Sequence, residues 1–173
     1  MSISQKKIAL IFPHHLFKTN PFDKEIDTYF LFEEDLFFNQ YHFHKQKIAF
    51  HRATLKSYEA YLSSHGKTIH YIEAQSKQSN IEHLILHLAN NNVSEVHHYE
   101  LTDNWLNKNL LKGVSKTNIK TVRYASQLFI NNKEDLQKFF RLDKKNFHQT
   151  TFYKQERKKL NLLLDKDGKP EGG

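Results

Sequence analysis

Five consecutive apolar residues, 8–12, stand near the start of the chain and end at Pro13. A short run without alternation, closed by a helix breaker, is typical of a strand buried on both faces of a parallel sheet. Residues 28–32 repeat the pattern and are closed by Glu33 and Glu34. Parallel strands need crossover connections, so we expect helices between the strands that follow.

Helical periodicity appears over residues 45–65, where Ile48, Leu55, Tyr58 and Leu62 share one stripe. Gly66 follows, where a helix end favours a left-handed residue. Ser79 and Glu82 have the spacing of a capping box, which predicts a helix over 81–88. Further strands are predicted at 68–72, 96–101 and 119–124, and further helices around Trp105–Leu110 (ending at Gly113), around 136–140 (capped by Asn131 or Asn132) and at 149–164.

This alternation predicts an α/β fold: a Rossmann-like three-layer domain with a mostly parallel five-stranded sheet and right-handed crossovers. Ligands of such sheets bind beyond the carboxyl ends of the strands, near the point where the strand order reverses. We therefore expect any ligand site in the loops that follow residues 12, 32 and 101.

Several classes of protein are excluded by what the sequence lacks. No dinucleotide or phosphate-binding glycine motif follows the first strand, and no nucleophile elbow is present. The chain has no cysteine, which removes disulfides, thiolate metal sites and cysteine nucleophiles. No apolar stretch reaches the roughly 20 residues of a membrane span, and no signal peptide is evident, so we expect a cytoplasmic protein without membrane contact.

The net charge of +7, with 12 histidines counted as neutral, allows two interpretations. A basic domain attracts polyanions such as DNA. The lysines, however, are spread along the chain, and the composition is rich in Asn, Lys, Ile and Phe, which equally indicates an ordinary solvated surface. This second interpretation is the more frequent one.

The loops after the first two strands are the most unusual segments. Pro13-His14-His15-Leu16-Phe17 follows the first, and an acidic, aromatic and amide-rich stretch from Glu33 to Lys47 follows the second. Aromatic rings beside carboxylates and amides suit a flat heterocycle that is stacked and read at its edge. The alternative is that the phenylalanines only anchor the loop to the core.

Neighbouring histidines, His14 with His15 and His42 with His44, raise the question of a metal site. No recognised ligand spacing accompanies them, so no metal is expected. On the last helix Lys154, Arg157 and Lys158 share one face, which suits a phosphate backbone or, more commonly, solvent.

Two stretches resemble a known family. His44-Lys45-Gln46-Lys47-Ile48 resembles the H-H-K-Q-K-I stretch of the deoxyribodipyrimidine photolyase-related proteins, the iron–sulfur branch of the cryptochrome/photolyase superfamily. The tail from Phe152 through Gly168-Lys169-Pro170-Glu171-Gly172-Gly173 resembles that family's F-Y-R-x-M-R to G-K-P-x-G-G. The match follows the whole chain in order.

The resemblance implies a division of labour. Residues 1–146 correspond to the α/β antenna-type domain, and 147–173 to a C-terminal helix and the start of a linker. In the family that linker leads to a helical domain that binds FAD and a 4Fe–4S cluster and transfers electrons to damaged DNA under light. No counterpart of that domain lies in these residues, so we expect a piece of such a protein or a stand-alone relative, inactive alone, whose partners are the FAD domain and, for the whole protein, DNA.

The family's N-terminal domain seats an antenna chromophore, a ribityllumazine. Where the family has G-D-Q-L after the first strand, this chain has Pro13-His14-His15-Leu16, a departure that alters the expected site. The candidate antenna or ligand residues are His14, His15, Leu16, Glu33, Glu34, Tyr41, Lys45 and Gln46, and the candidate DNA or partner contacts are Lys154, Arg157 and Lys158.

Two other hypotheses remain open. One is a free-standing nucleotide-handling domain in which His14, His15 or His42 act as acid–base groups, since histidine titrates near neutrality. The other is an interaction domain whose basic last helix packs on DNA or on a protein.

Overall fold

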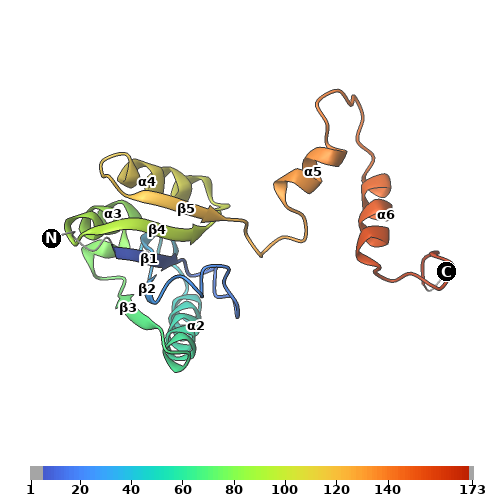
Figure 1. The fold of residues 1–173 in the computed structure, drawn as a ribbon. Helices are drawn as coiled ribbons and strands as arrows, with labels where there is room; N and C mark the ends of the chain where they lie inside the picture. Colours follow the sequence, from blue (N-terminus) through green and yellow to red (C-terminus); the bar gives the residue numbers. More distant parts are fainter. Residues whose placement is uncertain (1–5, 172–173) are drawn as a thin grey trace. The chain divides into compact units, whose positions relative to one another are not determined.

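The computed structural model describes residues 6–171, which divide into two compact units, residues 6–128 and 129–171 (Figure 1). In chain order the elements are β1 (Lys6–Ile11), β2 (Thr28–Phe32), α1 (Asp35–Phe38), α2 (Lys45–Ser64), β3 (Thr68–Ile72), the 3-10 helix η1 (Lys77–Ser79), α3 (Ile81–Asn90), β4 (Val93–Tyr99), α4 (Asn104–Val114), β5 (Lys120–Tyr124), α5 (Lys133–Phe139) and α6 (Gln149–Leu160).

The first unit is a five-stranded sheet in the order β3-β2-β1-β4-β5, and every neighbouring pair is parallel. Helix α2 covers one face, while α3 and α4 cover the other (Figure 1). The predicted Rossmann-like three-layer fold is confirmed.

Alternation along the central strand divides the core in two. Ile8 and Leu10 of β1 face the α3–α4 side, whereas Ala9 and Ile11 face the α2 side. All four side chains are buried. Burial on both faces is why the run at residues 8–12 shows no alternation of apolar and polar residues.

Local predictions differ from the structure mainly at element ends. Asn80, not Ser79, caps α3: its side chain accepts from the amides of Glu82 and His83, so the predicted capping box is wrong. Ser79 instead ends η1, one residue too early to serve as the cap. Strand β4 begins and ends before the predicted 96–101, and Gly66 has the predicted positive φ, 77°.

The second unit is built around four phenylalanines of α5, α6 and the loop between them, Phe139, Phe140, Phe147 and Phe152. Helix α6 ends at Leu160, four residues before the predicted end at 164, and its C-cap Asn161 has a left-handed φ of 51°. The predicted domain boundary at residue 146 lies inside this unit. That boundary was taken from the domain organisation of the family, whereas the two units are defined by their compactness. It stays a prediction.

Candidate functional site

The strand order reverses between β1 and β4, so the loops after these two strands flank the switch point of the sheet. After β1 the chain turns at once: the backbone amide of His15 donates to the carbonyl of Phe12 at 2.9 Å. Pro13 occupies the second position of this turn, where its fixed φ is favourable. The turn places both histidine rings at the carboxyl edge.

His15 is fully buried, and both ring nitrogens of His14 are also shielded from solvent. Across residues 6–171, none of the four ring nitrogens has a hydrogen-bond partner. Burial lowers the pKa of His15 to about 3, with neighbouring His14 and His98 adding to the effect. Burial likewise lowers the pKa of His14, against the opposing charge of Asp103. Both rings are therefore neutral at physiological pH.

Glu34 is the third buried polar group of this cluster. Its Oε2 caps α1 by accepting from the amide of Leu36 at 2.7 Å. Its Oε1 is buried and has no hydrogen-bond partner in the part of the chain that the structure describes. Burial raises the pKa of Glu34 to about 7. We call His14, His15 and Glu34 the switch-point cluster.

Aromatic rings surround the two histidines. The centroid of His14 lies 3.9 Å from that of His15 and 5.3 Å from that of Phe37. His15 lies 5.4 Å from Tyr99, and Phe12 lies about 6 Å from both histidines. Buried groups that form no hydrogen bonds, set among rings, are the features of a site for a flat, hydrogen-bonding ligand.

Glu33, the residue before Glu34, has hydrogen-bond partners at both of its carboxylate oxygens. Arg52 of α2 binds both its carboxylate oxygens, Tyr71 donates to Oε1 at 2.8 Å, and the amide of Ala74 donates to Oε2 at 2.9 Å. Burial alone would raise the pKa of Glu33, but these donors outweigh it and hold the pKa below its ordinary value. Both oxygens are thus occupied by the protein itself, in a clamp that joins β2, β3 and α2.

The remaining predicted ligand residues lie outside this cluster. Tyr41 is 62% exposed, and Lys45 and Gln46 are exposed in the first turn of α2. Leu16 is half-buried and packs on the α2 side of the core. The structure therefore brings together His14, His15 and Glu34, and separates them from the other predicted residues.

Sequence reasoning missed Arg52 and His51. Arg52 stands inside the apolar stripe of α2, between Ile48 and Leu55 at helical spacing, and a lone arginine there signals a buried acidic partner. His51 lies 6.3 Å from Phe37, ring to ring, and so borders the switch-point cluster. No comparable sequence signal marked it.

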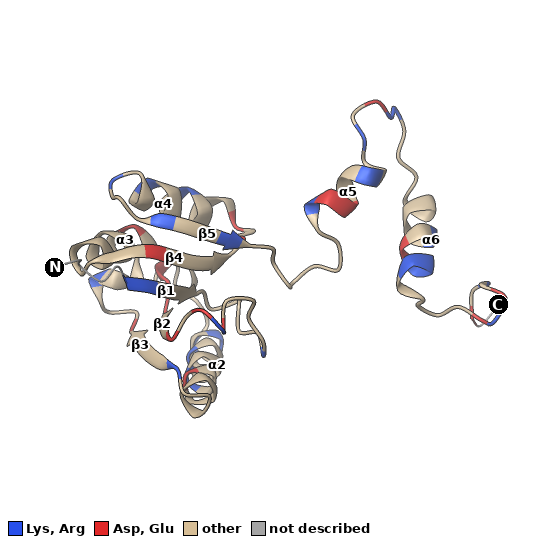
Figure 2. Cartoon of the chain, viewed as in Figure 1, with Lys and Arg blue, Asp and Glu red and all other residues tan. Residues whose placement is uncertain are grey.

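In the second unit, Figure 2 shows basic residues gathered on the last turns of α6. Arg157 is committed to structure: its guanidinium donates to the carbonyls of Leu162 and Leu163 and closes the turn after the helix. Lys154 and Lys158 are exposed. Of the three predicted contact residues, these two lysines are therefore the ones available to an anionic partner. Gly172 and Gly173 of the tail motif lie outside the described residues.

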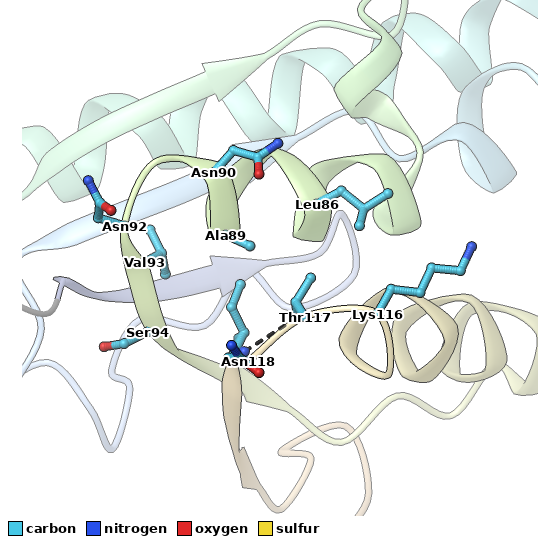
Figure 3. A pocket seen from close by; sticks show the side chains of 10 residues that line it. Leu86, Ala89, Asn90, Asn92, Val93, Ser94, Lys116, Thr117 and Asn118 are labelled. Atoms are coloured by element: carbon cyan, nitrogen blue, oxygen red, sulfur yellow. Dashed lines mark hydrogen bonds between the residues drawn. The ribbon is translucent and has the colours of Figure 1, made fainter.

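The first unit also has a pocket of about 460 Å³ at the amino end of the sheet, shown in Figure 3. Leu86, Ala89 and Val93 supply apolar lining, and Asn90 and Asn118 belong to its polar part. It contains no predicted site residue. Within residues 6–171 no group of three His, Asp or Glu side chains is placed to hold a metal ion, and no helix is long and apolar enough to cross a membrane.

Comparison with known proteins agrees with the fold. The family model described as deoxyribodipyrimidine photo-lyase-related protein matches residues 9–173. An uncharacterised protein of Acanthamoeba polyphaga mimivirus is 30% identical over 179 residues, an alignment that covers 97% of this chain and 89% of the viral protein. Since the family model matches nearly the full length, this chain belongs to the family of deoxyribodipyrimidine photo-lyase-related proteins.

Proposed function

We propose that this chain is an antenna-type, cofactor-supporting domain of a photolyase-related flavoprotein, and that the switch-point cluster seats a flat heterocycle of the ribityllumazine type. The observation that carries the proposal is the set of buried atoms without hydrogen bonds: four imidazole nitrogens and one carboxyl oxygen. Each such group costs roughly 1–3 kcal/mol when left unmet, so a ligand that supplies partners is favoured.

The chemistry of the cluster suits a neutral ring. A neutral imidazole offers one donor and one acceptor, so His14 and His15 together read both kinds of group on a ring edge. Glu34, with a pKa of about 7, accepts a hydrogen bond when ionised and donates one when protonated. Phe37 and Tyr99 provide aromatic surface beside these groups.

The Glu33–Arg52 clamp would stabilise the backbone next to this site. It fixes the end of β2, directly before Glu34, against α2 and the end of β3. A bound chromophore would absorb light and supply excitation energy. By family resemblance the acceptor is FAD in a helical domain, and the whole protein acts on DNA or senses light.

In the alternative, a nucleotide-handling domain with His14, His15 or His42 as acid–base groups, His15 is not suited to act as a general acid. With a pKa of about 3, His15 is neutral and a poor proton donor at physiological pH. We accordingly expect these 173 residues alone to show no light-dependent repair of a pyrimidine photoproduct.

The test is a fluorescence titration with ribityllumazine. We expect saturable binding by the natural sequence, loss of at least about tenfold in affinity for His15→Leu and for Glu34→Leu, and no change for His87→Ala, an exposed histidine on α3. No binding by the natural sequence, or equal binding by all four proteins, would refute the proposal.

A further inference from the structure

We infer that His51 of α2 binds a hydroxyl group on the ligand's side chain, and that this contact makes the site specific for a ring that carries a polyol. The inference rests on the proposed function and deepens it, because it names the residue that recognises the ribityl part of the ligand. His51 is not a member of the switch-point cluster. Its backbone carbonyl accepts from the hydroxyl of Thr54, but among residues 6–171 its ring forms no hydrogen bond.

His51 lies at the border of the switch-point cluster. The centroid of its ring is 6.3 Å from that of Phe37, and Phe37 in turn is 5.3 Å from His14. Burial lowers the pKa of His14, the charge of Asp103 opposes this, and the charge of His51 adds to the lowering. The shared contact with Phe37 and this electrostatic effect both place His51 beside His14.

The surroundings of His51 on α2 fix its position. Arg52, the next residue, binds both carboxylate oxygens of Glu33 at the end of β2. Ile48 and Leu55, about one turn before and one turn after His51, pack in the core on the α2 side of the sheet. A side chain held in this way is preorganised, which lowers the entropic cost of binding a ligand.

The burial of His51 is intermediate between that of the cluster and that of the surface. His15 is fully buried and both ring nitrogens of His14 are shielded from solvent, whereas His51 is half-buried. A ligand ring that fills the buried cluster must extend its substituent toward solvent. His51 borders the cluster on its more exposed side, where such a substituent would leave.

The chemistry of the His51 ring suits a hydroxyl group. Burial, followed by the nearby charge of Lys47, lowers the pKa of His51, so the ring is neutral at physiological pH. A neutral imidazole has one donor and one acceptor, and a hydroxyl group offers the same two functions in return. The ring has no positive charge to attract an anion. A neutral polyol is therefore the substituent that fits it.

Asp103, in the loop after β4, is the acidic side chain whose charge acts on His14, and it provides a comparison. Its Oδ1 caps α4 by accepting from the amide of Leu106 at 2.8 Å. Asp103 thus has a structural role already, whereas the His51 ring has no hydrogen-bond partner in the described part of the chain. We therefore assign recognition of the side chain to His51 and use Asp103 as a control.

The test compares ribityllumazine with its N-methyl analogue, which has the same ring and a methyl group in place of the ribityl chain. In fluorescence titrations we expect the natural sequence to bind ribityllumazine about tenfold more tightly, a factor that corresponds to about 1.4 kcal/mol, or roughly one to two hydrogen bonds. His51→Phe keeps a ring beside Phe37 but has no nitrogen, so it should abolish this preference and leave the affinity for the analogue unchanged. His51→Leu repeats the test without the larger ring.

Three further variants serve as controls. His51→Gln retains a donor and an acceptor and should keep part of the preference for ribityllumazine. Asp103→Asn retains a good capping side chain for α4 and should keep the preference in full. His87→Phe changes an exposed histidine on α3 and should also keep it in full.

Equal affinities of the natural sequence for the two compounds would overturn the inference alone, since the ring would still bind. A preference that survives in both His51→Phe and His51→Leu, or that disappears in Asp103→Asn, would overturn it as well. Binding of neither compound has a different meaning: it would refute the proposed function and, with it, this inference.

Discussion

Glu33 and Glu34 are adjacent, equally buried carboxyls at the same edge of the sheet, yet their surroundings are opposite. Glu33 receives donors from Arg52, Tyr71 and Ala74, and its pKa is lowered. Glu34 receives no side-chain donor; the backbone amides near it, chiefly that of Leu36, lower its pKa, but burial outweighs them and raises the pKa to about 7. The Glu33 clamp is complete without a ligand, whereas the switch-point cluster is not. The two carboxyls are equally buried, so burial does not tell them apart. Their hydrogen-bond partners do: Glu33 fits a structural role and Glu34 a ligand-binding role.

The largest effect should come from breaking the clamp. Arg52→Ala leaves Glu33 buried without its counter-ion, so we expect a loss of about 3–5 kcal/mol in the free energy of unfolding. Lys112→Ala, which removes an exposed ion pair with Glu82 away from the clamp, should cost less than about 1 kcal/mol. Urea denaturation of both variants measures the contrast. Similar losses would show that the clamp is no more than a surface ion pair.

Next in size is the pH dependence contributed by Glu34. Its pKa is higher in the folded chain, about 7, than the ordinary 4.5, so the folded state binds more protons between these values. Its contribution to stability is therefore fully present below about pH 4.5 and is lost as the pH rises through 7. At about 1.4 kcal/mol per pKa unit, the change is at most about 3 kcal/mol.

Glu34→Gln isolates this contribution, because glutamine can still cap α1 but does not titrate. Relative to the natural sequence, the variant should become more stable as the pH rises from 4.5 to 8. Asp35 and Asp103, which also raise the pKa of Glu34, remain unchanged. A stability difference that is flat with pH would show that Glu34 titrates normally.

A smaller effect, of opposite sign to the first, is expected at His15. His15→Leu removes a fully buried imidazole whose nitrogens are unpartnered within residues 6–171, so it should raise stability by about 1–2 kcal/mol. The same variant should bind ribityllumazine more weakly, because substitutions that stabilise a binding site commonly reduce its function. A destabilised His15→Leu would place His15 with the structural residues, beside Glu33.

The smallest change is expected at the exposed start of α2. Lys45→Gln removes no ion pair seen among the described residues and should alter the free energy of unfolding by less than about 0.5 kcal/mol. Thermal denaturation without ligand checks this. A larger loss would mean that Lys45 supports the fold.

The fold was predictable because its signals are local. Unbroken apolar runs marked β1 and β2, and Gly66 marked the end of α2. The cap of α3 was misassigned by one residue because Ser79 and Asn80 both have capping side chains, and only the local backbone decides between them.

The site was only partly predictable. The loops after residues 12 and 32 were two of the three expected locations, because ligands of parallel sheets bind beyond the carboxyl ends of the strands. Sequence alone could not separate Glu33 from Glu34, because their difference lies in donors from α2, β3 and the loop after β3. Nor could it show that Tyr41 is exposed while His15 is buried.

Long-range nitrogen-15 NMR of the histidine rings, recorded with and without ribityllumazine, tests the central claim most directly. The account predicts that His14 and His15 are neutral without ligand and that their ring nitrogens shift on binding. His97, already bonded to Glu95 at 2.8 Å and to Tyr124 at 2.9 Å, should not change. Saturating ligand that leaves the His14 and His15 signals unmoved would contradict the assignment of the switch-point cluster as the ligand site.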